Sequence, residues 1–278
     1  MTTLFIGGGN MASALIGGLL ARGRTAGSLA VVEPVEAQRD RLAARFPGVA
    51  LHAAVGADAV RGATLVVLAV KPQQMRDACA ALAPYVHAAT AGAPAAVGCV
   101  LSIAAGTRSA DIAQWLGGFD RVVRAMPNTP AMVGKGIAGL HAQPAVDPAQ
   151  RDAAAAVLEA GGEVVWVDRE AMLDAVTGVS GSGPAYVFYF LEALENAARA
   201  QGFAPADARR LAYATFDGAV ALVKASAEEP ATLRAQVTSK GGTTERGIAA
   251  LDAAGVRAAV VAAVAAATAR AAELGAGN

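Results

Sequence analysis

Short apolar runs alternate with amphipathic stretches over the first 165 positions of the chain. The runs are rich in valine, leucine and alanine, and they predict strands at residues 3–7, 29–33, 49–52, 64–70, 97–103, 121–125, 137–141 and 163–168. The stretches between them predict helices at residues 13–22, 35–46, 56–61, 107–116 and 149–160. Asp147 and Pro148 suit the N-cap and first turn of the last of these helices. Such alternation predicts an α/β fold with a parallel sheet.

The strand pattern stops after residue 168. The remaining apolar positions have helical spacing, at residues 172–179, 184–201, 205–225, 231–237 and 243–274. We therefore expect two domains, an α/β domain at residues 1–165 and an all-α domain at residues 166–278.

The predicted helix at residues 184–200 is apolar on almost every face, a pattern typical of a helix that is covered all round. A domain of this size cannot bury such a helix by itself, so we expect a second subunit to cover it. An alternative hypothesis is that Tyr186 or Tyr189 acts as an acid–base group, although a packing role is the simpler interpretation.

A glycine-rich turn follows the first predicted strand directly. Gly7, Gly9 and Ala12 match the G-x-G-x-x-G/A fingerprint of Rossmann-type folds. The first glycine makes the turn, the second admits a pyrophosphate, and the small third residue allows the helix to pack closely. This strand, turn and helix predict dinucleotide binding.

Two features near the second strand disagree about the cofactor. Glu33 ends that strand, where a carboxylate accepts hydrogen bonds from the adenosine ribose and favours NAD(H). Arg39 and Arg41 follow, and either could turn back to the 2′-phosphate of NADP(H) or simply lie on a solvated helix face. Both cofactors therefore stay open.

Three further strand ends carry candidate cofactor contacts. Lys71 and Pro72 end one strand abruptly at the edge where open parallel sheets bind ligands. Ala104 and Ala105 follow another strand, and their small side chains permit close approach of a ligand. Asn128 lies between two prolines and is interpreted either as a nicotinamide ligand or as part of an ordinary Asx-turn.

A second glycine-rich turn, VTSKGGTTERGIAAL at residues 237–251, precedes the last predicted helix. Its hydroxyl residues and glycines allow backbone N–H groups to converge on an anion at the helix start. The alternative is that Thr243 or Thr244 caps the helix.

Composition and charge limit the kinds of partner that the chain can be expected to bind. The 278 residues have a formal net charge of zero and no basic cluster, so we expect no nucleic-acid partner. Cys79 and Cys99 have no metal-ligand spacing and are assigned to the core, and the three histidines are isolated, so we expect no metal site. The N-terminus does not read as a secretory signal, and the apolar tract at residues 258–269 is shorter than the ~20 residues of a membrane span. We expect a cytoplasmic protein without a membrane partner.

The chain resembles the pyrroline-5-carboxylate reductases, which catalyse the last step of proline biosynthesis. The resemblance rests on AVKP at residues 69–72, MPNTP at 126–130, VSGSGPAY at 179–186 and TSKGGTT at 238–244, in this order behind GGGNMA. It implies a Rossmann-type domain followed by a helical domain that interlocks with a two-fold mate, an active site shared between subunits, and in many members a ring of five dimers.

By the same resemblance, NAD(P)H would contact Ile6, Gly7, Gly8, Gly9, Asn10, Met11, Ala69, Val70, Lys71 and Pro72, with Ala104, Ala105 and Asn128 near its nicotinamide. The substrate would be held by Ser239, Gly241, Gly242, Thr243 and Thr244. The family favours NADPH. Two positions depart from its pattern, Glu33 and Gly56, where Ser, Asn or Arg and an Asn are common, and both lie on the adenine side of the cofactor.

Hydride transfer to a protonated cyclic imine requires orientation but no general base. We expect the carboxylate to be clamped by the N–H groups of Gly242, Thr243 and Thr244, with Thr244 as the catalytic positioner and possible proton relay. A 3-hydroxyacid dehydrogenase or general imine reductase is the second reading. The helix at 184–200 lacks the lysine that hydroxyacid dehydrogenases use as a base. A non-catalytic dinucleotide-binding regulator is the third.

Overall fold

The structure, a computed structural model, describes residues 2–87 and 97–276 and divides the chain into two compact units. The first unit comprises Met1–Ser182 and Ala266–Asn278, and the second comprises Gly183–Ala265. The predicted boundary after residue 165 thus falls inside the first unit. The reason is that Glu170 and Asp174, which follow that boundary, are bonded to side chains of the sheet and its helices.

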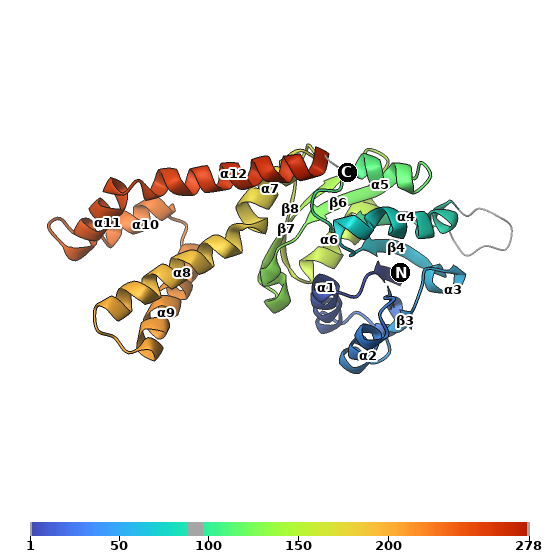
Figure 1. Cartoon of the computed structure of the whole chain (residues 1–278), viewed down its shortest axis with the longest axis horizontal. Helices are drawn as coiled ribbons and strands as arrows, with labels where there is room; N and C mark the ends of the chain where they lie inside the picture. The colour runs from blue at the N-terminus through green and yellow to red at the C-terminus, as the bar shows by residue number, and fades with distance from the viewer. Residues whose placement is uncertain (1, 88–96, 277–278) are drawn as a thin grey trace. The chain divides into compact units, whose positions relative to one another are not determined.

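The first unit is built on an eight-stranded sheet with the order β3-β2-β1-β4-β5-β6-β7-β8 (Figure 1). β7 pairs antiparallel with β6, and the other neighbouring pairs are parallel. All eight predicted strands are present, at β1 (Thr2–Ile6), β2 (Leu29–Val32), β3 (Ala50–His52), β4 (Ala63–Leu68), β5 (Cys99–Ser102), β6 (Val122–Met126), β7 (Gly136–Ala142) and β8 (Gly162–Trp166).

Alternate side chains of the strands enter two hydrophobic layers. Phe5 of β1 packs into the layer under α1 (Asn10–Ala21), α2 (Glu36–Arg45) and α6 (Pro148–Glu159). Leu4 and Ile6 pack into the opposite layer, under α3 (Ala57–Val60), α4 (Pro72–Val86) and α5 (Ser109–Trp115). Cys79 and Cys99 are buried, one in each layer, as free thiols, which confirms their assignment to the core. The α/β prediction for this part of the chain is confirmed.

Two local details of this unit bear on the sequence patterns. Asp147 and Gln150 form a reciprocal capping box at the start of α6, as its Asp-Pro sequence predicts. Helix α4, in contrast, was not predicted. Its first turn begins at Pro72, where proline fits because that position needs no N–H donor. The strand β4 already ends at Leu68, so this proline starts a helix and does not end the strand.

The second unit is helical, as predicted. It contains α8 (Gly183–Ala200), α9 (Pro205–Ala225), α10 (Pro230–Gln236), α11 (Thr243–Ala253) and the first part of α12 (Val256–Ala276). The prediction of one continuous helix over residues 243–274 is wrong, because Gly255 adopts a left-handed backbone with φ +70° between α11 and α12. Before this unit in the sequence, α7 (Met172–Val176) continues into a π-helical turn at Thr177–Gly181, and both belong to the first unit.

Apolar side chains of the second unit are widely exposed in a single chain. No residue of α8 is buried, and Phe188 and Tyr189 are 63% and 71% exposed. Among the described residues, α12 alone has the length and apolarity of a membrane span, and only 11% of its most apolar window is buried. The helix is thus longer than the predicted tract at 258–269. An exposed apolar helix of this kind is also what a subunit interface requires.

The end of α12 returns to the first unit. A Cβ on Gly106, in the loop after β5, would lie 3.6 Å from Leu274, and a Cβ on Gly275 would lie 2.8 Å from Arg108 Nε. Ala271 is buried there as well. Residues 266–276 therefore cover the loop between β5 and α5.

Candidate functional site

The turn between β1 and α1 has the geometry of a dinucleotide cradle. Gly7 has φ +99°, and a Cβ there would lie 2.7 Å from the carbonyl oxygen of Ala69, so only glycine fits. Gly9 is the N-cap of α1 and offers no side-chain acceptor, and a Cβ on Gly9 would meet nothing within 4 Å. The first N–H groups of α1 are thus open to a ligand, and Ala12 is buried as the fingerprint requires. These residues fit a pyrophosphate.

The loops that follow the neighbouring strands β1, β4 and β5 share one edge of the sheet with this cradle. The N–H of Ala69 donates to the carbonyl of Ile6 at 2.8 Å, which ties the loop after β4 to the end of β1. Lys71 is exposed at the N-cap of α4, and Ala104 is buried while Ala105 is exposed after β5. The predicted contact residues that the structure brings to this edge are Ile6–Met11, Ala69–Pro72, Ala104 and Ala105.

Glu33, the predicted ribose contact, has partners within the protein. It is buried, and its carboxylate accepts hydrogen bonds from the N–H groups of Gly8 and Val35, each at 2.9 Å. Each carboxylate oxygen therefore already accepts one hydrogen bond from the protein backbone, and the predicted ribose contact would require the same oxygens to accept further bonds from a ligand.

Asn128 also has protein partners at both ends of its amide. Nδ2 donates to the carbonyl oxygen of Ser180 at 3.0 Å, and Oδ1 accepts from the N–H of Ile137 at 2.9 Å. The side chain is buried and joins the loop after β6 to the start of β7 and to the π-helical turn. This geometry is neither an Asx-turn nor a free amide facing a nicotinamide, and it favours a bracing role.

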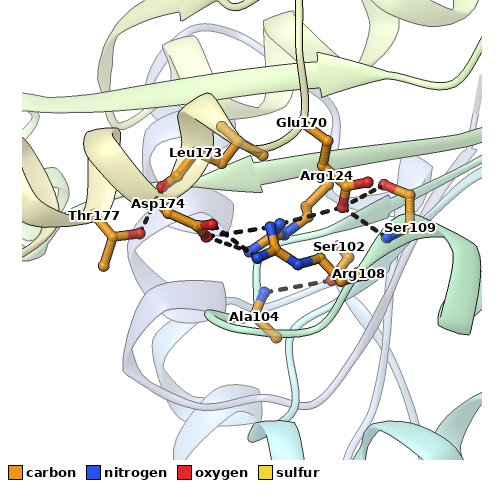
Figure 2. A network of polar contacts seen from close by, with 9 residues as sticks. All are labelled: Ser102, Ala104, Arg108, Ser109, Arg124, Glu170, Leu173, Asp174 and Thr177. Atoms are coloured by element: carbon orange, nitrogen blue, oxygen red, sulfur yellow. Dashed lines mark hydrogen bonds and ion pairs between the residues drawn. The ribbon is translucent and has the colours of Figure 1, made fainter. Parts of the chain in front are cut away.

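A buried ionic network lies beside the loop after β5 (Figure 2). Arg124, on β6, is 2% exposed and contacts Glu170 at 3.2 Å and Asp174 at 3.8 Å. Arg108 reaches Asp174 with both terminal nitrogens, at 3.3 and 2.8 Å. Burial lowers the pKa of the Arg124 guanidinium, and the charge of Glu170 opposes that effect. A buried arginine stays charged and needs such partners.

The same network holds the start of α5. Oε1 of Glu170 accepts from the N–H of Ser109 at 2.8 Å and from its hydroxyl at 3.1 Å. A carboxylate at this place satisfies an otherwise unpaired N–H group and interacts favourably with the helix dipole. The loop that carries Ala104 and Ala105 is thus fixed at its far end by Glu170, which precedes α7, and by Asp174 within α7. No sequence motif pointed to this network, although a glutamate and an aspartate one helical turn apart were a usable signal.

The predicted substrate loop of the second unit is a tight turn ahead of α11. Gly241 has φ +74°, and Gly242 is the N-cap without a side-chain cap, so the prediction that Thr243 or Thr244 caps the helix is wrong. Both threonines are exposed in the first turn of α11, and their N–H groups have no intrahelical acceptor.

Two other N–H groups of this loop are occupied. That of Gly241 donates to Glu245 Oε2 at 2.7 Å, and that of Gly242 donates to the carbonyl oxygen of Ser239 at 3.0 Å. The predicted clamp of three donors at residues 242–244 therefore reduces to those of Thr243 and Thr244.

Metal ligands were not expected from the sequence. Over residues 2–87 and 97–276 the structure contains no group of three or more His, Cys, Asp or Glu side chains that could hold a metal ion.

Comparison with known proteins gives a consistent assignment for both parts of the chain. A family described as pyrroline-5-carboxylate reductase dimerisation matches residues 170–274, and one described as NADP oxidoreductase, coenzyme F420-dependent, matches residues 2–90. The first match covers the predicted substrate loop and α8, and the second covers the glycine turn between β1 and α1.

Relatives named pyrroline-5-carboxylate reductase match over nearly the whole chain. The pyrroline-5-carboxylate reductase of Pseudomonas aeruginosa is 44% identical over 97% of this chain and 95% of its own, and that of Synechocystis is 40% identical over 97% of each. The solved structure of the Coxiella burnetii enzyme has a TM-score of 0.91 at 36% identity, covering 98% of both chains. The Plasmodium falciparum enzyme, solved with NADP bound, has a TM-score of 0.82 at 25% identity, covering 99% of this chain and 98% of its own. With a dinucleotide cradle in one unit and an uncapped helix start in the other, the chain belongs to the pyrroline-5-carboxylate reductase family.

Proposed function

We propose that this chain reduces 1-pyrroline-5-carboxylate to L-proline with a hydride from NAD(P)H, the last step of proline biosynthesis. The observation that carries the proposal is the presence of two uncapped helix starts behind glycine turns. The start of α1 suits a pyrophosphate, and the start of α11 suits a small carboxylate. Family membership supports the assignment of the reaction.

The chain supplies orientation for this chemistry. A dinucleotide held at the start of α1 would supply a hydride to the C=N carbon of the protonated imine, and the imine nitrogen would take the π-electron pair of the C=N bond and become an amine. The nitrogen already carries its proton, so no side chain has to act as a general base. This agrees with α8, which contains no lysine over its length from Gly183 to Ala200.

The backbone N–H groups of Thr243 and Thr244 hold the substrate carboxylate in this proposal. A charge-assisted hydrogen bond to each contributes about 1.5–3 kcal/mol. Ser239, Gly241 and Gly242 shape the turn that presents these donors. The Thr244 hydroxyl is then the group that meets the ring nitrogen, and Thr244 is the catalytic residue of the proposal.

We also propose that the working form is a homodimer in which two helical units cover each other, and that five such dimers combine into a ring. The exposed apolar side chains of α8 support the dimer, because a monomer would expose them to water. The dimerisation family matched by residues 170–274 supports it independently. The substrate loop of one protomer would then serve the dinucleotide of its partner. For the location we propose the cytoplasm, where the free thiols of Cys79 and Cys99 stay reduced.

The test is a spectrophotometric assay of the purified protein with NADPH or NADH. Three substrates are compared: 1-pyrroline-5-carboxylate, a six-membered cyclic imine carboxylate, and a 3-hydroxyacid assayed with the oxidised dinucleotide. We expect rapid oxidation of the reduced dinucleotide with the five-membered imine. Faster turnover of the hydroxyacid would assign the chain to another dehydrogenase class, and dinucleotide binding without any turnover would make it a non-catalytic regulator.

A further inference from the structure

The Gly8 peptide is held on both sides by residues at and after the end of β2. Its N–H donates to Glu33 Oε2 at 2.9 Å, and its carbonyl oxygen accepts from Gln38 Nε2 at 2.7 Å. A Cβ on Gly8 would lie 2.5 Å from Leu42 Cδ1, so the peptide is also packed closely against α2. The glycine turn is therefore preorganised by β2 and α2.

The Glu33 carboxylate is committed to the protein backbone through both of its oxygens, which leaves at most one lone pair on each for a ligand. Oε2 binds Gly8 and Oε1 accepts from the N–H of Val35 at 2.9 Å, and the residue is 9% exposed. A ribose reader must instead present its carboxylate to two hydroxyl groups of the ligand. Turning Glu33 toward a ribose would leave the Gly8 and Val35 N–H groups without this acceptor, which carries a free-energy cost.

A cation is held at the same strand end. Arg39 Nη1 donates to the carbonyl oxygens of Glu33 and Pro34, each at 2.8 Å. Both bonds use one nitrogen of a guanidinium that carries five N–H donors, so donors remain for a ligand. In dinucleotide-binding folds an arginine near this strand end accommodates the 2′-phosphate of NADP(H). Arg41, two residues further on, is exposed and only reaches Gln38 Oε1 at 3.3 Å.

We propose that Glu33 braces the glycine turn and does not read the ribose, and that Arg39 is the residue that selects NADPH over NADH. The inference rests on the proposed function only in requiring that the chain binds a dinucleotide. The brace acts equally on both cofactors, because the turn it holds faces the pyrophosphate that they share. Arg39 acts on the one group that distinguishes them.

Four variants separate the two roles. Glu33→Gln removes the charge and one of the two acceptors, whereas Glu33→Asp keeps the charge but is one methylene too short to reach both N–H groups. Arg39→Met removes the cation and keeps the length of the side chain. Arg41→Met makes the same change on the same helix and is the matched control. Direct titration of NADPH and NADH by fluorescence, without substrate, gives the affinities, and thermal denaturation of the ligand-free protein reports the brace.

We expect both Glu33 variants to lower the ligand-free melting temperature and to weaken NADPH and NADH by the same factor, so that the ratio of the two affinities is unchanged. Arg39→Met lowers the affinity for NADPH by about 10- to 100-fold and leaves NADH within about two-fold. Arg41→Met alters neither affinity.

Two results would overturn the inference. The first is a tenfold or larger shift of the affinity ratio toward NADPH in Glu33→Gln, with Glu33→Asp unchanged, because that is the behaviour of a ribose reader. The second is unchanged NADPH binding in Arg39→Met. Because Arg39→Met leaves both hydrogen bonds of the Glu33 carboxylate in place, it tests the second half alone if the Glu33 variants fail to fold. A wild-type protein that binds neither dinucleotide would refute the proposed function as well, which distinguishes the two failures.

Discussion

The network around Arg124 allows a sharp test of what a buried charge contributes to this fold. The perturbation is Asp174→Asn, which keeps the shape of the side chain and removes its charge. Asp174 is 5% exposed, accepts two bonds from Arg108 at 3.3 and 2.8 Å, and lies 3.8 Å from Arg124. After the substitution an amide N–H₂ group faces one of the guanidinium nitrogens, Arg108 loses its carboxylate partner, and Arg124 keeps only that of Glu170.

The magnitude follows from burial. Removing one partner of a fully buried ion pair costs about 3–5 kcal/mol, because the other charge is left uncompensated. The Arg108 side chain is 25% exposed, so water screens part of the loss on that side, while Arg124 at 3% side-chain exposure has no such relief. We therefore expect Asp174→Asn to lower the free energy of unfolding by about 2–4 kcal/mol.

Urea denaturation followed by tryptophan fluorescence measures this loss. Trp115 and Trp166 both lie in the first unit, so their emission reports the part of the chain that contains the network. Protein concentration is held constant, because association shifts apparent stability. The matched control is Asp58→Asn, whose pair with Arg61 is 72% and 83% exposed and should contribute less than about 1 kcal/mol. Equal losses in the two variants would refute the argument from burial.

Three further predictions concern the site, the thiols and the assembly. Thr244→Ala should lower kcat/KM by about one to three orders of magnitude without changing dinucleotide affinity. The control is Thr238→Ala, which should leave kcat/KM unchanged because the Thr238 hydroxyl donates to the Arg234 carbonyl in α10. Unchanged turnover in Thr244→Ala would remove Thr244 from the mechanism. Burial raises the pKa of the Cys79 and Cys99 thiols to about 12, so Ellman's reagent at pH 8 should label neither thiol until urea is added. Because this folded pKa lies above the usual value of 9.0, the contribution of the two thiols to stability should be complete below pH 9 and be lost as pH rises toward 12. Phe188→Asp should convert the proposed dimer into a monomer in sedimentation velocity experiments, and a dimer that persists at low micromolar concentration would exclude α8 from the interface.

Local patterns predicted most of the fold because each strand and helix has a period of its own. The run at residues 205–225 predicts α9 with its bounds, and Asp147 with Pro148 predicts the start of α6. The same reasoning joined α11 and α12 into one helix. A glycine within an alanine-rich run can continue a helix or adopt a left-handed backbone, and the sequence does not show that Gly255 does the second. A proline at position 72 was read as the end of a strand, which hid the helix that it begins.

The candidate site was less predictable, because its bonds connect residues far apart in the sequence. The Gly8 N–H bonds Glu33 across 25 positions, and Arg124 bonds Glu170 across 46. A carboxylate at the end of β2 gives the same sequence pattern whether its side chain faces a ribose or the protein backbone. Asn128 is a similar case, since its two partners lie on β7 and on the π-helical turn. The chemical type of each residue was visible, and the direction of its side chain was not.

The return of residues 266–276 to the first unit also has a consequence for how the protein is made. The chain leaves the ribosome in order, so the segment that covers the loop between β5 and α5 emerges only after the whole of Gly183–Ala265 has been synthesised. At translation rates of roughly 5–20 residues per second, this delay is on the order of 4–16 s. During that interval the nascent sheet unit is complete in its strands but lacks the contacts of Leu274 and Gly275 beside Gly106 and Arg108. The edge of the sheet that carries the candidate cofactor contacts is therefore among the last parts of the protein to reach its final form, and an early arrest of translation leaves a sheet without these contacts in place.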